Sequence, residues 1–154
     1  MPVADFKTYC RMLDTAKNHR FAFPAINVSS IVTANAVLKG FAQAKCDGII
    51  QVSTGGGEFA SGTSVKSMAL GAISLAQHIH LVADQYDVCI ALHTDHCTPG
   101  KLDTFVKPLI EETRKRRAQG LQNLFNSHMF DGSELPLEEN MKIAVPLLED
   151  CAAN

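Results

Sequence analysis

The sequence lacks the features that mark membrane proteins and exported proteins. No uninterrupted apolar stretch approaches the roughly 18 residues that suggest a membrane-spanning helix. The N-terminus, Met1-Pro2-Val3-Ala4-Asp5, has neither the basic region nor the apolar region of a signal peptide. We therefore expect a cytoplasmic protein with no membrane partner.

An excess of charge of one sign is also missing. Lys and Arg number 14 against 16 Asp and Glu, which gives a net charge of -2, and no basic stripe is interleaved with aromatic residues. Surfaces that bind nucleic acid are normally basic patches, so we expect no nucleic-acid partner. This balance does not exclude phosphate-bearing metabolites as ligands.

Closely spaced cysteines are absent as well. An odd, scattered set without Cys-x-x-Cys spacing argues against a disulfide framework and against a zinc ribbon. We expect reduced thiols, mostly buried as small apolar side chains. The five cysteines are Cys10, Cys46, Cys89, Cys97 and Cys151.

The sequence does contain an alternation of short apolar segments with longer segments of helical period. The first helical segment has apolar residues at every third or fourth position, and we expect it to act as a lid that precedes the repeating units. We predict strands at residues 21–28, 48–53, 88–92 and 124–129, and helices at residues 4–18, 31–45, 68–83, 99–120 and 136–151.

The predicted strands are apolar along their length, as expected for strands that are buried on both faces of a parallel sheet with helical crossovers. An α/β (β/α)8 barrel typically needs ~250 residues, so 154 residues with four strand-helix units supply about half of one. An open doubly wound sheet is the alternative, but the first strand-helix junction lacks the Gly-x-Gly-x-x-Gly fingerprint. We therefore predict a TIM barrel of which about the first four βα units are present, with a leading helix at 1–19 and the units at 20–154.

Polar residues terminate all four predicted strands. In barrels of this kind, chemistry takes place at the carboxyl ends of the strands. These ends carry, in chain order, Asn27, Ser53, residues 93–96 and residues 127–131. One polar end would be unremarkable, but four are difficult to explain by packing alone. We therefore predict a functional site at this end of the sheet.

The second strand end continues into a glycine-rich segment, Ser53-Thr54-Gly55-Gly56-Gly57. Glycine allows the close approach and the unusual dihedral angles that a nest of backbone N–H groups needs around a phosphate. A glycine-rich segment after a strand is more often only a flexible turn. Both interpretations stay open from the residues alone.

The third strand end holds His93-Thr94-Asp95-His96-Cys97. Asp95 and His96 are adjacent, so on extended backbone their side chains would point in opposite directions. Both reach one cavity only if the strand has already turned into a loop. Histidine suits Zn²⁺, but a catalytic zinc needs about three protein ligands, and His93 competes with His96 for this role. From residue types alone, such a motif is more often structural than metal-binding.

Asp131 follows the fourth predicted strand, directly before Gly132. A carboxylate at this position is able to serve as a second metal ligand. It is equally able to form the turn before the glycine, and residue type alone favours the turn.

Together these residues resemble the class II fructose-1,6-bisphosphate aldolases, and the likeness runs from residue 21 to the C-terminus. The His-Thr-Asp-His-Cys string after an apolar strand is the most diagnostic part, and coincidence of all the matching segments in order is improbable. These segments are Pro24-Ala25-Ile26-Asn27, Gln51-Val52-Ser53-Thr54-Gly55-Gly56, Ala91-Leu92-His93-Thr94-Asp95-His96-Cys97 and Ser127-His128-Met129-Phe130-Asp131-Gly132-Ser133.

The resemblance implies a (β/α)8 barrel, dimeric or tetrameric, that interconverts fructose 1,6-bisphosphate with dihydroxyacetone phosphate and glyceraldehyde 3-phosphate in glycolysis and gluconeogenesis. Zinc replaces the lysine Schiff base of the class I enzymes. By position, Asp95 matches the acid that exchanges a proton with the C4 hydroxyl, and His96 matches a catalytic zinc ligand. Ser53 matches a substrate contact, Asn27 lies near the substrate, and Asp131 matches a ligand of a second metal site.

The set of matching residues is incomplete. The family's other two zinc-binding histidines, a carboxylate at the fifth strand and most phosphate contacts belong to the second half of the barrel, and no residues of this sequence match them. We therefore expect weak zinc binding and little activity from this chain alone. Three interpretations stay open: a piece of a longer aldolase, a truncated product, or a half-barrel module that pairs with another half and binds phosphate through residues 53–56. Within the family, a tagatose-bisphosphate aldolase is the alternative.

Overall fold

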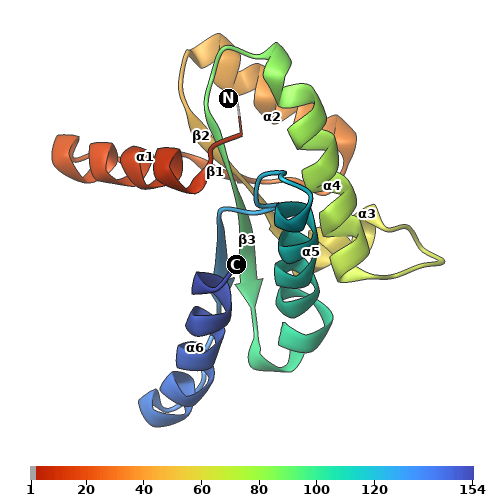
Figure 1. Cartoon of the computed structure of the whole chain (residues 1–154). Helices are drawn as coiled ribbons and strands as arrows, with labels where there is room; N and C mark the ends of the chain where they lie inside the picture. Colours follow the sequence, from red (N-terminus) through yellow and green to blue (C-terminus); the bar gives the residue numbers. More distant parts are fainter. Residues whose placement is uncertain (1–2) are drawn as a thin grey trace.

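The computed structural model describes residues 3–154, so the first two residues of the predicted leading segment 1–19 lie outside the described residues. Four parallel strands form one sheet in the order β1-β2-β3-β4, and each is followed by a helix (Figure 1). This confirms the predicted α/β class and the four strand-helix units. The elements are α1 (Phe6–His19), β1 (Ala25–Asn27), α2 (Ile31–Ala44), β2 (Gly48–Ser53), α3 (Thr54–Ala60), α4 (Met68–Val82), the 3-10 turn η1 (Ala83–Gln85), β3 (Ile90–Cys97), the 3-10 turn η2 (Pro99–Thr104), α5 (Val106–Ala118), β4 (Ser127–Phe130) and α6 (Leu137–Ala152).

The main core lies between one face of the sheet and helices α2, α4 and α5. Successive residues of a strand face opposite sides of the sheet, and Ile50, Val52, Ile90 and Leu92 all face these helices and are fully buried. The helices contribute an apolar face each, with Leu38, Phe41, Leu75, Ile79, Val106 and Leu109 among the buried residues.

Helix α1 lies on the opposite face, near the amino ends of the strands. Its backbone is attached to β3 just before the helix begins, because Ala4 N donates to Ile90 O over 2.8 Å. Met12 of α1 and Ala91 of β3 then form a second, smaller buried cluster. Figure 1 shows α1 projecting away from helices α2, α4 and α5. The helix therefore covers the amino ends of the strands and not the carboxyl ends that carry the predicted site.

Three predicted strands, which correspond to β1, β3 and β4, differ in extent from those in the structure. Strand β1 is limited to residues 25–27, because the segment before it has Pro24, which has no N–H to donate, and the edge-to-face pair of Phe21 and Phe23 with ring centroids 5.0 Å apart. Strand β4 begins three residues late because Leu124 N donates to Thr113 Oγ1 instead of to a neighbouring strand.

The other differences follow the second and third strands. The glycine-rich segment after β2 is the short helix α3, not a turn. Strand β3 continues to Cys97, five residues beyond the prediction, and Pro99 begins the 3-10 turn η2 before α5 starts at Val106.

Close packing of two glycines explains why the segment after β2 is helical. A Cβ atom on Gly71 of α4 would overlap the carbonyl oxygen of Gly57 in α3, and a Cβ on Gly57 would overlap the carbonyl oxygen of Met68. Only glycine therefore lets these two helices approach so closely. The tertiary contact overrides the poor helix propensity of three consecutive glycines.

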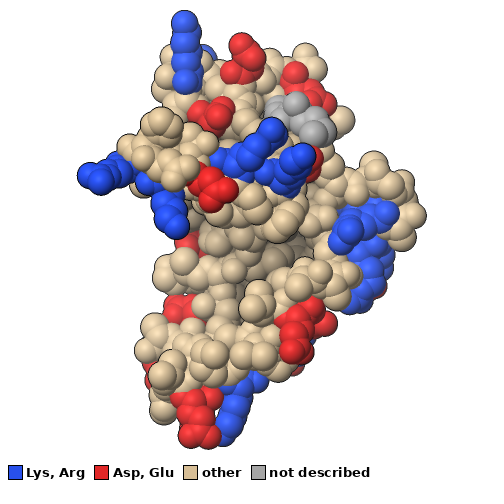
Figure 2. All heavy atoms as spheres, turned by 60° about the vertical axis from the view of Figure 1, so that its left-hand side comes forward, with Lys and Arg blue, Asp and Glu red and all other residues tan. Residues whose placement is uncertain are grey.

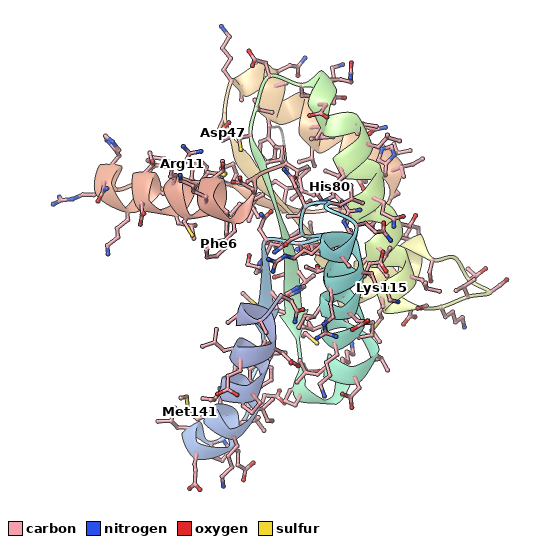
Figure 3. All side chains as sticks on the ribbon, in the orientation of Figure 1. Phe6, Arg11, Asp47, His80, Lys115 and Met141 are labelled. Carbon is pink, nitrogen blue, oxygen red and sulfur yellow. The ribbon has the colours of Figure 1, made fainter. Side chains whose placement is uncertain are left out.

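The last helix is only loosely attached. Helix α6 has no buried residue. Pro146 lies inside the helix and does not interrupt it. Ile143 and Leu147 reach the main core, while an apolar stripe of four residues faces solvent. Figure 3 labels one of these, Met141, together with the exposed Phe6 of α1. The stripe consists of Leu137, Met141, Val145 and Leu148. No helix within residues 3–154 is long and apolar enough to cross a membrane.

Candidate active site

The carboxyl ends of the strands bring three predicted site residues to one edge of the sheet. The parallel register places Ser53 beside Asp95, and both side chains lie on the face opposite the main helices. Asn27, at the end of β1, donates a hydrogen bond from Nδ2 to Asp95 Oδ2 over 2.8 Å. One carboxylate oxygen of Asp95 is therefore held by the end of β1, across the intervening strand β2.

A β-bulge allows His96 to join the same edge. Thr94 pairs with His128 and Cys97 pairs with Phe130, so β3 has one residue more than β4 over this interval. His96 takes up the extra residue with a φ of 40°, in the left-handed region that is strained for a non-glycine residue. The prediction that the strand has turned into a loop at this point is therefore wrong. A bulge inside β3 brings the side chains of Asp95 and His96 to one site instead.

The bulge places His96 between two carboxylates. His96 Nε2 lies 3.8 Å from Asp95 Oδ1, and His96 Nδ1 lies 2.9 Å from Asp131 Oδ2. The hydrogen bond to Asp131 and the charge of Asp95 raise the pKa of His96 above its ordinary value. Adjacent residues thus reach one site from one strand, which regular alternation would not permit.

Asp131 combines the two roles that the sequence left open. Its Oδ1 accepts a hydrogen bond from Ser133 N over 3.1 Å, as a turn-forming aspartate does, and its Oδ2 contacts His96. Its own backbone N–H donates to Cys97 O over 2.8 Å, which ties the turn to β3. The hydrogen bonds from Ser133 and His96 lower the pKa of Asp131 to about 2.

Ser53, the last residue of β2, caps helix α3. Its Oγ accepts a hydrogen bond from Gly56 N over 3.1 Å, in the manner of an N-cap residue. This bond uses one of the backbone donors that the phosphate-nest interpretation required. A cation lies close by, because Lys101 Nζ donates to Thr54 Oγ1 over 3.1 Å. Sequence reasoning missed Lys101, which no local motif sets apart.

A second polar row lies directly below Ser53 and Asp95 on the same face. The register aligns Asn27, Gln51, His93 and Ser127 across all four strands. His93 Nδ1 lies 2.8 Å from Ser127 Oγ, and burial lowers the pKa of His93. His93 thus lies outside the group formed by His96 and its two carboxylates. Gln51 and His93, which precede Ser53 and Asp95 by two residues, were the signal in the sequence for this row.

The side chains present fit one ligand position of a zinc site. His96 has a carboxylate on Nδ1, which leaves Nε2 for a metal, and this is the usual arrangement of a zinc-binding histidine and its supporting carboxylate. Within residues 3–154, no group of three or more His, Cys, Asp or Glu side chains is placed to hold a metal ion. A catalytic zinc needs about three protein ligands.

No single sign of charge dominates the face of the molecule that Figure 2 shows. Figure 2 shows Lys, Arg, Asp and Glu spread over the molecule and a recess in the middle of the view that is formed largely by uncharged residues.

Comparison with known proteins gives one family over nearly the full chain. Residues 7–154 match the family described as fructose-bisphosphate aldolase class-II. The fructose-bisphosphate aldolase of Mycobacterium leprae is 53% identical over 153 residues, which are 99% of this chain and 44% of the relative. The class 2 fructose-bisphosphate aldolase of Escherichia coli is 41% identical over 90% of this chain and 40% of its own length.

A solved structure agrees with the sequence matches. The crystal structure of a fructose-bisphosphate aldolase from Campylobacter jejuni superimposes with a TM-score of 0.91 at 38% identity, over 98% of this chain and 44% of that protein. The chain therefore spans less than half the length of these relatives.

Proposed function

Because this chain belongs to the class-II fructose-bisphosphate aldolase family, we propose that it supplies the first half of an active site for the reversible aldol cleavage of fructose 1,6-bisphosphate. The products are dihydroxyacetone phosphate and glyceraldehyde 3-phosphate. The contact of His96 with both Asp95 and Asp131 is the observation that carries this proposal, because it places an acid beside an imidazole whose second nitrogen is free for a metal.

Asp95 is the proposed catalytic acid and base. In cleavage it accepts the proton of the C4 hydroxyl, the C4 oxygen forms the aldehyde carbonyl, and the electrons of the C3–C4 bond pass to the ketose fragment. In condensation the same carboxyl group returns the proton. Asn27 holds Oδ2 of Asp95, so Oδ1, on the side of His96, is the oxygen that meets the substrate. Ser53 is the proposed substrate contact of the second strand end.

Zinc is the proposed cofactor, with His96 as one of its ligands through Nε2. When bound, zinc acts as a Lewis acid that polarises a carbonyl group. Asp131 orients the imidazole by accepting a hydrogen bond from Nδ1. Its role as a ligand of a second divalent metal stays a prediction from the family resemblance.

The four-stranded sheet is the proposed first half of a (β/α)8 barrel. The outer edges of β1 and β4 have no neighbouring strand within residues 3–154. Open edges of this kind are normally covered in a folded protein. The stripe on α6 is exposed to solvent, with Leu137 at 77% and Leu148 at 69% exposure, and Leu148 lines a pocket together with residues of β4. The second half of the barrel would cover both features and supply the other zinc ligands.

The family resemblance also supports a phosphorylated sugar as ligand, a cytoplasmic location and a homo-oligomeric assembly. The tagatose bisphosphate isomer is the alternative substrate. A half-barrel that binds phosphate without catalysis is a separate alternative, but Ser53 Oγ and Gly56 N bond each other, which weakens it.

Fragment complementation tests the proposal. Residues 1–154 are co-expressed with the part of the Mycobacterium leprae relative that lies beyond the matched region, and cleavage of fructose 1,6-bisphosphate is measured with and without EDTA. We expect activity that EDTA and Asp95→Ala both abolish, against little activity and weak zinc binding for residues 1–154 alone. Strong EDTA-sensitive cleavage by the isolated chain, or a complemented assembly that is insensitive to Asp95→Ala, would contradict the proposal.

A further inference from the structure

We propose that Tyr9, acting through Ser127, is a positioning residue that keeps the N–H of His93 on Nε2, where it donates to the substrate beside Asp95. The first part of this inference rests on contacts alone. Its last step, the effect on turnover, rests on the proposed aldolase function.

Three residues from separate elements form a hydrogen-bonded line. Tyr9 OH of α1 lies 3.0 Å from Ser127 Oγ of β4, and Ser127 Oγ lies 2.8 Å from His93 Nδ1 of β3. The line therefore joins the helix at the amino ends of the strands to the polar row below Asp95. Among residues 3–154, the His93 ring bonds Ser127, whose Oγ lies 2.8 Å from Nδ1 and whose backbone also bonds the ring.

Tyr9 is held firmly enough to direct its hydroxyl group. The phenol ring packs on the small cluster that Ala4, Met12 and Ala91 form. The carbonyl oxygen of Ala4 accepts a hydrogen bond from Asn126 Nδ2 over 2.8 Å. The segment just before α1 is therefore attached to the segment that leads into β4. The distance between Tyr9 and Ser127 is thus fixed by contacts on both sides.

The chemistry of the three groups sets the direction of the line. A hydroxyl group donates one proton and accepts others, whereas a neutral imidazole has one donor nitrogen and one acceptor nitrogen. Phenol is the better donor and imidazole the better acceptor, so the favoured order is Tyr9 O–H to Ser127 Oγ, and Ser127 O–H to His93 Nδ1. A histidine that accepts at Nδ1 carries its proton on Nε2.

This order decides whether His93 presents a donor or an acceptor nitrogen to a ligand on the face of the sheet opposite the main helices. His93 precedes Asp95 by two residues, so both side chains are on one face of β3. An Nε2–H group donates a hydrogen bond to a sugar oxygen and does not compete with Asp95 for a proton. Without the Tyr9 hydroxyl, Ser127 is free to accept from an Nδ1–H group, and His93 then presents a lone pair at Nε2.

The ring nitrogen signals of histidine test the direction of the line without any assay of activity. Residues 1–154 are labelled with ¹⁵N-histidine, and long-range proton–nitrogen correlation spectra distinguish the two tautomers. We expect the Nε2–H form for His93 in the unaltered chain, and a shift towards the Nδ1–H form in Tyr9→Phe. Tyr86→Phe is the matched control, because Tyr86 is the other tyrosine and packs on the main core.

Either of two results would overturn the inference: an Nδ1–H tautomer for His93 in the unaltered chain, or spectra of Tyr9→Phe that equal those of Tyr86→Phe. The signals of His80 and His128, which have other partners, report whether a variant keeps its fold. The spectrum of the unaltered chain decides the direction of the line even if a variant unfolds.

Turnover in the complemented assembly tests the last step. Loss of one hydrogen bond to the substrate corresponds to a kcat about 3- to 10-fold lower for Tyr9→Phe, with KM unchanged and with Tyr86→Phe equal to the parent. An unchanged kcat alongside a shifted tautomer would contradict this step. An inactive parent assembly would contradict the proposed aldolase function instead, and the spectra would still decide the positioning contact.

Discussion

His96 Nδ1 and Asp131 Oδ2 lie 2.9 Å apart, although the two residues are 35 positions apart in the chain. The contact joins the bulged residue of β3 to the turn after β4. Because His96 has a left-handed backbone conformation, this partner stabilises a strained position and orients the imidazole at the same time.

Replacement of Asp131 by asparagine keeps the size of the side chain and removes its charge. We expect the pKa of His96 in Asp131→Asn to fall towards its ordinary value of 6.5, because the hydrogen bond to a carboxylate is the main cause of its rise. In the complemented assembly, zinc affinity should fall about 10- to 100-fold, as for other carboxylates that support a zinc-binding histidine. NMR titration of the His96 ring and zinc titration measure the two effects.

The pair also predicts the pH range in which it stabilises the fold. The raised pKa of His96 gives a contribution that is complete below 6.5 and is lost as pH rises through the folded value. The lowered pKa of Asp131 gives a contribution that is present above 3.8 and is lost as pH falls through about 2. The difference in unfolding free energy between Asp131→Asn and the parent should be greatest between these limits. It should be small, because the His96 side chain is 63% exposed. A difference in unfolding free energy that does not vary with pH would contradict a stabilising contact between His96 and Asp131. An equal difference in the control Asp103→Asn would contradict it as well.

Asn27→Ala should slow turnover in the complemented assembly. The substitution removes the hydrogen bond that holds Asp95 Oδ2. A hydrogen bond to a charged group contributes about 1.5–3 kcal/mol, so we expect kcat to fall about 10- to 100-fold. Asn35→Ala is the control, because Asn35 bonds His78 on the helical side of the molecule. Equal rates for the two variants would show that Asn27 does not act on Asp95.

The strand ends that carry Asn27, Ser53 and Asp95 could be located from the sequence, because each follows a short apolar run whose period and length are local properties. The bulge at His96 could not, since it depends on how β3 aligns with β4. The contact between Tyr9 and Ser127 spans 118 residues and is not encoded in any local pattern.

The helix α3 was also missed because it depends on a contact with another element. Three consecutive glycines favour a turn, and the helix exists because Gly57 meets Gly71 of another helix. Contacts between elements therefore determined α3, the bulge at His96 and the contact between Tyr9 and Ser127. The expected cysteine burial holds in part: Cys97 is buried and the other four cysteines are half-buried.

Gly71→Ala and Gly40→Ala should change stability in opposite directions, although both glycines lie inside helices. The Cβ of an alanine at position 71 would overlap Gly57 O, and we expect a loss of about 1–3 kcal/mol. Nothing lies within 4 Å of a Cβ at position 40, so Gly40→Ala should stabilise by about 0.4–1 kcal/mol through the unfolded state. Urea unfolding of residues 1–154 measures both changes. A stabilising Gly71→Ala would show that α3 and α4 do not pack as described.

His128 should make the fold less stable in mild acid. Its Nδ1 lies 2.8 Å from Thr94 Oγ1, and burial, followed by the nearby His93, lowers its pKa from 6.5 to about 4. The unfolded chain therefore binds a proton more readily than the folded chain between these values. The contribution of His128 to stability is therefore constant above pH 6.5. The unfolding free energy falls as pH decreases from 6.5 to about 4, by up to about 1.4 kcal/mol per pH unit.

His128→Gln isolates this effect, because glutamine does not titrate and keeps a polar group near Thr94. The unfolding free energy of the variant should vary less between pH 6.5 and pH 4 than that of the parent, whatever its absolute value. His19→Gln is the control, since His19 is exposed at the end of α1. Parallel curves for His128→Gln and the parent would mean that His128 is protonated as easily in the fold as in the unfolded chain, and the buried contact with Thr94 would then have to be abandoned.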